Sequence, residues 1–177
     1  MHSLWVYSDA LGGQALSPIV LDNGLLYTGF WNDEELDANY VCLSVTDEDP
    51  EKTDEEKLAS WIYSHSGGFY WAGAYIEEDY LYIGTDDGSA EGYNANSRLI
   101  SIDKHTGKVV DDIKISGSGD IRSSITMADG KLYFTSKGGF FHEAEYDPKT
   151  GDIISLRSLA LENGSNGVPM STSTPTV

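Results

Sequence analysis

The stretch Leu81-Tyr82-Ile83-Gly84-Thr85-Asp86-Asp87-Gly88, with Arg98-Leu99-Ile100-Ser101-Ile102 and Asp103-Lys104-His105-Thr106-Gly107-Lys108 after it, decides the fold. Its apolar runs are rich in β-branched and aromatic residues, which favour strands. Between and after the runs lie Gly, Asp and Thr, which favour tight turns. The stretch therefore predicts two strands joined by a loop, and a tight turn that leads into another strand.

The first of these strands recurs along the chain. Its copies are Leu25-Leu26-Tyr27-Thr28-Gly29, Tyr80-Leu81-Tyr82-Ile83-Gly84 and Lys131-Leu132-Tyr133-Phe134-Thr135, whose central tyrosines lie 55 and 51 residues apart. A short predicted first strand precedes each copy. These first strands are Ser17 to Val20, Ala72 to Tyr75 and Ser123 to Thr126, and Thr174 to Val177 continues the series at the same spacing. A period of this length indicates a repeat architecture.

Two further strands are predicted in each copy. The third strands are Tyr40 to Val45, Arg98 to Ile102 and Glu143 to Tyr146, and the fourth are Ser60 to Ser64, Val109 to Ile115 and Ile153 to Leu159. Four short strands per repeat are typical of a β-propeller blade. A β-sandwich is the alternative, but it does not require turns, strands and glycines to recur together at one long period.

These motifs carry a family resemblance. The order strand, Asp-Gly, strand and Asp-x-x-Thr-Gly-Lys in the second copy resembles the pyrroloquinoline-quinone-like repeat. The third copy has Ser136-Lys137-Gly138-Gly139 instead of Asp-Gly but keeps Asp147-x-x-Thr150-Gly151, and the first copy lacks the Thr-Gly turn. The resemblance implies an all-β propeller segment of about three four-stranded antiparallel blades, with partial blades at each end. It implies no single function, because one fold serves many functions.

We expect one partial propeller domain over residues 1–177, with blade repeats at about 14–64, 69–115 and 120–159. Residues 4–8 resemble the fourth strand at 60–64, and residues 171–177 resemble a first strand, so each end is predicted to belong to an incomplete blade. Uncovered blade faces and unpaired edges promote association. The expected partner is therefore either the remaining blades of a longer chain or a second copy.

An acidic excursion, Asp47 to Lys57, interrupts the first copy. Thr53-Asp54-Glu55-Glu56 fits a capping box and predicts a short helix from about residue 54. We interpret the excursion as a solvated outer rim. An acidic knob that binds a partner is the alternative.

The charge of the chain excludes some partners. With 29 acidic and 11 basic residues the formal net charge is −18, which disfavours binding to nucleic acid and to anionic membrane surfaces. No apolar run approaches the roughly 20 residues of a membrane-spanning helix. Cys42 is the single cysteine, which fits a cytosolic protein or an exported bacterial one without disulfides. We expect an extracellular or cell-surface bacterial protein whose signal peptide is not within this chain.

Candidate ligand-binding residues are Tyr70, Trp71 and Arg122, which the repeat offsets assign to the mouth of the central channel. The aromatic rings suit stacking on a sugar or a planar cofactor, and the guanidinium suits a carboxylate. The alternative is that the aromatics only wedge between blades.

A calcium ion is the cofactor that the acidic loops suggest. Asp86, Asp87 and Glu91 offer oxygen ligands, as does the loop at residues 32–37, although neither has the spacing of a twelve-residue calcium loop. The alternative is an acidic hairpin loop. Quinone dehydrogenases of the resembled family use a neighbouring cysteine pair, which a chain with one cysteine lacks, so we expect no quinone binding by this segment alone.

The sequence thus favours a non-enzymatic binding or scaffold module of an exported or cell-surface bacterial protein, acting on a protein or a carbohydrate. The alternative is part of a quinoprotein-like dehydrogenase whose active site lies partly in blades outside this chain.

Overall fold

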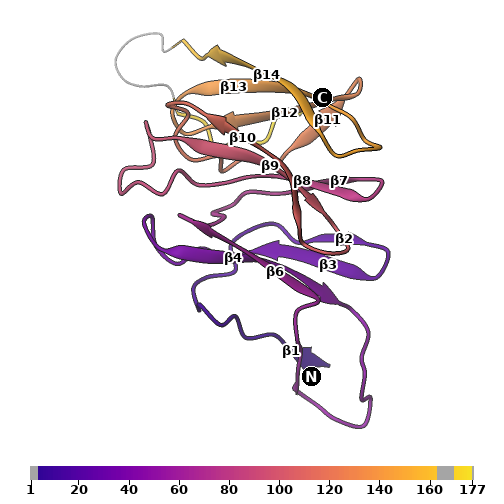
Figure 1. Ribbon diagram of the computed structural model, residues 1–177. Coiled ribbons are helices and arrows are strands. Elements are labelled where there is room, and N and C mark those ends of the chain that lie inside the picture. The colour runs from indigo at the N-terminus through magenta and orange to yellow at the C-terminus, as the bar shows by residue number, and fades with distance from the viewer. Residues whose placement is uncertain (1–3, 163–169, 177) are drawn as a thin grey trace.

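The chain folds into three stacked sheets (Figure 1). The computed structural model describes residues 4–162 and 170–176, and these ranges contain strands and no helix. Each sheet has four antiparallel strands in chain order. We call the sheets the first, second and third blade. This arrangement confirms the predicted all-β class and the predicted four-stranded unit.

The strands of the first blade are β2 (Val20–Asp22), β3 (Leu25–Gly29), β4 (Asp37–Ser44) and β6 (Trp61–Ser66). Those of the second are β7 (Tyr75–Glu77), β8 (Tyr80–Gly84), β9 (Ser97–Asp103) and β10 (Val109–Ile115). Those of the third are β11 (Thr126–Ala128), β12 (Lys131–Ser136), β13 (Phe140–Tyr146) and β14 (Ile153–Ala160). The first strand of each blade begins three residues later than predicted. The residues before it bond to the neighbouring blade instead, as where the Ile125 N–H donates to the Gly73 carbonyl.

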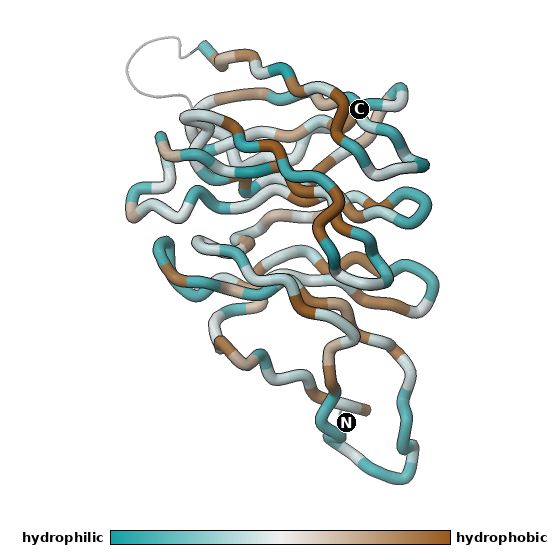
Figure 2. The backbone as a smooth tube through the Cα atoms, viewed as in Figure 1, coloured by the Kyte–Doolittle hydropathy of each residue, from teal (hydrophilic) through white to brown (hydrophobic). Residues whose placement is uncertain are grey.

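The second blade is buried on both faces, and its side chains alternate between two cores. In β8, Leu81 and Ile83 pack against the first blade, in a core with Tyr27, Tyr40 and Trp61. Tyr82, between them in sequence, packs against the third blade. Successive side chains of a strand point to opposite faces, so a strand buried on both faces is apolar throughout. The brown segments of Figure 2 follow these stacked strands, while the turns that join them are mostly teal.

The repeat glycine at the end of β8 allows two blades to approach closely. A Cβ on Gly84 would lie 2.2 Å from the Ile121 side chain, which enters from the chain segment before the third blade. Gly29, 55 residues earlier, faces Phe69 in the same manner. The glycine of the repeat is thus a packing requirement.

The acidic excursion contains no helix, and the capping-box prediction is wrong. Instead β5 (Glu55–Glu56) pairs in parallel with β1 (Trp5–Val6). Trp5 and Tyr7 pack on the outer face of the first blade beside Phe30 and Val41. This packing draws the neighbouring segment into an extended pairing, which overrides the local helix signal. The role of residues 4–8 as the fourth strand of a preceding blade stays a prediction.

Residues 170–176 lie against the third blade without forming a regular strand. The Thr126 hydroxyl donates to the Pro175 carbonyl at 3.0 Å, and the Thr135 hydroxyl donates to the Ser173 carbonyl at 2.9 Å. Val177 lies outside the described residues. The predicted domain boundaries, including a first strand at 171–177, stay a prediction.

Candidate functional site

The linkers between the blades gather at one end of the three blades. In each antiparallel blade the connection between second and third strands and the linker to the next blade emerge at the same end. Loops 30–36 and 85–96 and linkers 67–74 and 116–125 therefore share this end, which we call the loop end. In propellers such loops border the central channel.

Arg122, in the linker before β11, is the centre of a buried ionic cluster at the loop end. Its Nη2 donates to both oxygens of Glu34, at 2.9 and 2.8 Å, and to Asp86 Oδ2 at 3.0 Å. Asp120 Oδ2 lies 2.8 Å from the same nitrogen. Asp86 and Asp120 are fully buried. Because Glu34 belongs to the first blade, Asp86 to the second and Arg122 to the third, one guanidinium joins all three blades.

Tyr70 covers this guanidinium. Its ring centroid lies 4.3 Å from Arg122 Cζ, within the range of a cation–π contact. Trp31 meets the Tyr70 ring edge-on at 5.0 Å. The structure therefore brings two of the candidate residues, Tyr70 and Arg122, together. Arg122 already has three carboxylate partners.

Trp71 lies beside Tyr70, with ring centroids 4.5 Å apart. It is 47% exposed and has a positive φ of 59°. A bulky residue rarely adopts this left-handed conformation. Trp71 thus presents about half of its surface to solvent at the loop end.

Burial controls the protonation of two carboxylates in the cluster, those of Asp86 and Asp120. It raises the pKa of Asp86 well above its usual value, and the charge of Asp120 raises it further. Burial also raises the pKa of Asp120 to about 6, against the Asp87 N–H and the Arg122 charge, which lower it. For Arg122 burial favours the neutral form, but the charges of Asp86 and Asp120 outweigh it and raise the pKa of the guanidinium. The cation is permanent, and the carboxylates titrate around it.

The three carboxylates predicted to hold calcium do not converge. Asp86 faces Arg122, whereas Asp87 accepts the backbone N–H groups of Ser89 and Ala95 within its own loop. Glu91 is exposed and contributes its backbone carbonyl to Lys137. Among the described residues the carboxylate oxygens that approach one another within 4.8 Å are those of Glu34, Asp86 and Asp120. The Arg122 guanidinium lies among them and would compete with a metal ion.

Sequence reasoning did not single out Glu34, Asp120 and Lys137. Glu34 was within the oxygen-rich loop at 32–37, but nothing in that loop pointed to Arg122, 88 residues away. Lys137 Nζ lies 3.3 Å from Asp120 Oδ2 and adds a second cation to the cluster. The available signal was the pair Asp120 and Arg122, which flank Ile121 in a linker whose repeat position had already been assigned.

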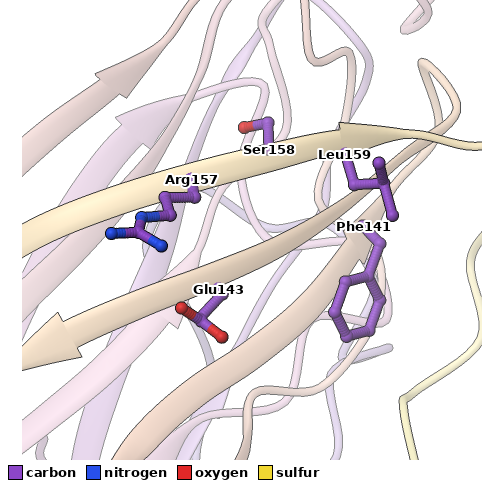
Figure 3. A pocket seen from close by; sticks show the side chains of 5 residues that line it. All are labelled: Phe141, Glu143, Arg157, Ser158 and Leu159. Atoms are coloured by element: carbon purple, nitrogen blue, oxygen red, sulfur yellow. The ribbon is translucent and has the colours of Figure 1, made fainter.

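A second surface lies on the third blade, on the face turned away from the second. Ala144 and Tyr146 of β13 face the second blade, so Phe141 and Glu143 face the other way. They pair with Leu159 and Arg157 of β14 and line a cavity of about 260 Å³ (Figure 3). Leu159 is 67% exposed. Among the described residues no further sheet covers this face.

Comparison with solved structures identifies the fold. BamB from Moraxella catarrhalis is similar with a TM-score of 0.57 and 18% sequence identity, covering 96% of this chain and 44% of BamB. A europium-containing methanol dehydrogenase is similar with a TM-score of 0.56 and 15% identity, covering 85% of this chain and 26% of that chain. The chain has the pyrroloquinoline-quinone-like β-propeller fold.

The propeller resemblance drawn from the repeat is therefore confirmed at the level of the fold. This propeller segment spans less than half the length of BamB. No family model matches the sequence, and no curated protein matches it. The described part of the propeller segment has no helix that is long and apolar enough to cross a bilayer.

Proposed function

We propose that this propeller segment is a non-enzymatic binding or scaffold module of an exported or cell-surface bacterial protein, which contacts a protein or a carbohydrate. The observation that carries the proposal is the state of Arg122. Three carboxylates occupy its Nη2 group and an aromatic ring covers the guanidinium, so the strongest charge cluster of the loop end holds blades together. The group left exposed beside it is Trp71, an aromatic surface suited to binding.

The similarity to BamB supports a role without catalysis, and the similarity to a methanol dehydrogenase favours the alternative, a part of a quinoprotein-like enzyme. The residues of this chain do not fit a quinone cofactor. The single cysteine, Cys42, is buried in the core between the first and second blades, beside Tyr27 and Trp61. Arg122 has no free side of its Nη2 group for a cofactor carboxylate. An active site of that kind would depend on residues outside this chain.

The open face of the third blade supports a partner that packs on the sheet. Its occupant is either a further blade of a longer chain or a second copy. Phe141 and Leu159 supply apolar contact, and Glu143 beside Arg157 supplies charges of both signs (Figure 3). A face of this composition suits protein contact.

The function is tested by calorimetric titration of the full-length protein with neutral oligosaccharides, calcium chloride and pyrroloquinoline quinone. We expect no heat of binding for the quinone. The matched variant is Trp71→Asn, because Asn tolerates a positive φ and so removes the ring without new backbone strain. Quinone binding that is lost in Trp71→Asn would overturn the non-enzymatic proposal in favour of the dehydrogenase alternative.

A further inference from the structure

A second cavity opens at the loop end, between the second and third blades. Its volume is about 600 Å³, and its lining residues are Glu91, Tyr93, Asn94, Gly117, Gly138 and Phe140. The size is within the range of about 300–1,000 Å³ usual for small-ligand sites. The lining comes from the β8–β9 loop, the linker to the third blade and the start of β13, so the cavity depends on the packing of two blades.

One aromatic ring of this cavity, that of Tyr93, is held in place by a lysine. Lys137 Nζ lies 4.5 Å from the centroid of the Tyr93 ring, a cation–π contact. The same nitrogen donates to the Glu91 carbonyl at 3.2 Å and to Asp120 at 3.3 Å. The ring remains 40% exposed. Tyr93 is therefore a fixed, partly exposed platform, and Lys137 connects it to the Arg122 cluster.

Polar groups at the rim of the cavity are free to bind a ligand. Glu91 and Asn94 are exposed, and their side chains form no hydrogen bond or ion pair with another described residue. A carboxylate accepts hydrogen bonds, and an amide both donates and accepts them. Gly117 and Gly138 contribute no side chains to the space. The cavity thus combines two aromatic rings, Tyr93 and Phe140, with unpaired polar groups.

We propose that this cavity binds a neutral carbohydrate, with a sugar ring stacked on Tyr93 and its hydroxyls bound by Glu91 and Asn94. The inference rests on the proposed binding function and names its ligand class and site. Sugar hydroxyls donate to carboxylates and exchange bonds with amides, while the C–H face of a sugar suits an aromatic ring. Glu91 and the net charge of −18 disfavour anionic ligands. Lys137 already makes the cation–π contact with the Tyr93 ring, which disfavours a cationic ligand at that ring.

The test is calorimetric titration of the full-length protein with maltotriose, cellotriose and triacetylchitotriose, and with trigalacturonic acid as the anionic comparison. We expect at least one neutral trisaccharide to bind and trigalacturonic acid not to bind. Tyr93→Ala and Asn94→Ala should each weaken that binding by about tenfold or more. Asn94 is exposed, so its variant keeps the test valid if Tyr93→Ala disturbs the fold. Leu58→Asn is the control and should leave the affinity unchanged, because Leu58 is 79% exposed in the first blade and does not line the cavity.

Several outcomes would overturn the inference. Absence of binding by all three neutral trisaccharides at millimolar concentration would do so, as would unchanged affinity in both Tyr93→Ala and Asn94→Ala. If Trp71→Asn abolishes sugar binding and the cavity variants do not, this site is wrong while the proposed binding function stands. Quinone binding would instead remove the proposed function itself.

Discussion

His142, in β13 of the third blade, is a buried histidine. Its ring nitrogens lie 2.8 and 2.9 Å from the hydroxyls of Ser158 and Ser136, and its ring stacks on Phe134 at 4.7 Å. The side chain is fully buried, and burial lowers its pKa to about 4. Two hydroxyls satisfy a neutral imidazole but cannot compensate a buried charge.

His142 should therefore make stability depend on pH. Its folded pKa of about 4 is below the unfolded value, so the unfolded chain binds more protons between about pH 4 and 6.5. The contribution of this histidine to stability is present above pH 6.5 and declines as the pH falls. In urea unfolding the wild type should lose about 1.5 kcal/mol more than His142→Gln between pH 6.5 and 5. An equal loss in both proteins would contradict the assignment of a neutral His142.

The Asp-x-x-Thr-Gly turn connects neighbouring blades at the end opposite the loops. In the second blade the Lys104 carbonyl accepts the indole N–H of Trp61 at 2.8 Å, and Lys104 Nζ lies 2.8 Å from Asp22 of the first blade. In the third blade the Lys149 carbonyl accepts the Tyr80 hydroxyl at 3.2 Å. Each turn therefore contacts an aromatic residue of the preceding blade. This contact explains why the motif recurs in blades that stack on one another.

The glycine of that turn has a packing role, and a matched pair of variants can separate this role from the effect of backbone strain. A Cβ on Gly107 would lie 2.7 Å from the Trp61 ring, whereas a Cβ on Gly130 would meet no atom within 4 Å. Both glycines have a positive φ, 72° and 73°, so alanine introduces similar backbone strain at each. Gly107→Ala should lower the free energy of unfolding by about 1–3 kcal/mol more than Gly130→Ala, because it overpacks the interface. Equal losses in urea unfolding would show that the turn does not constrain the blades.

At the scale of the whole molecule, replacement of Arg122 should lower the free energy of unfolding most, because Arg122 contacts all three blades. Arg122→Met leaves the Asp86 carboxylate buried without a cation and the Asp120 carboxylate with Lys137 as its remaining cation, and breaking a buried pair in this way typically costs about 3–5 kcal/mol. The raised pKa of Asp120, about 6, sets the sign of the pH dependence. Asp120 binds more protons in the folded than in the unfolded protein between about pH 4 and 6. Its contribution to the free energy of unfolding is therefore present below that window and declines as the pH rises. In Arg122→Met the pKa of Asp86 and of Asp120 rises further, because the Arg122 charge that lowers both is gone, so the variant takes up more protons there than the wild type and its deficit should shrink as the pH falls toward 5.

The control is Arg98→Met. Arg98 pairs with Asp112 at 2.6 Å, with both side chains about one-third exposed. Partly exposed pairs contribute about 0–1 kcal/mol. If guanidinium chloride unfolding gives Arg122→Met a loss no greater than that of Arg98→Met, the cluster does not hold the blades together.

The open face of the third blade should cause this 177-residue chain to self-associate. Leu159 is on that face, so Leu159→Glu should weaken association by burying a charge in the contact. Leu58→Glu is the control, because Leu58 is 79% exposed directly after the acidic excursion of the first blade. Sedimentation velocity at micromolar concentration should show a dimer or larger species for the wild type and for Leu58→Glu, and more monomer for Leu159→Glu. A wild type that is entirely monomeric would refute this prediction.

The repeat alone predicted the blades. The spacing of Tyr27, Tyr82 and Tyr133 identified equivalent strands, because a residue type that recurs together with its turn at one period marks the same position in each blade. The local helix prediction at Thr53 to Glu56 was wrong, because a capping box reports only local hydrogen bonding. There the contact of Trp5 and Tyr7 with the first blade decided the outcome.

The sequence by itself thus determined the all-β repeat and its register, since strand alternation and turn chemistry are local and recur with the period. It also indicated that Tyr70 and Arg122 occupy the loop end. Only the tertiary structure decided what Arg122 does there. The carboxylates of Glu34 and Asp86 lie 88 and 36 residues before it, and they meet the guanidinium because stacked blades bring their loops to one end. The same stacking separated Asp86 from Glu91 and opened the cavity beside Tyr93.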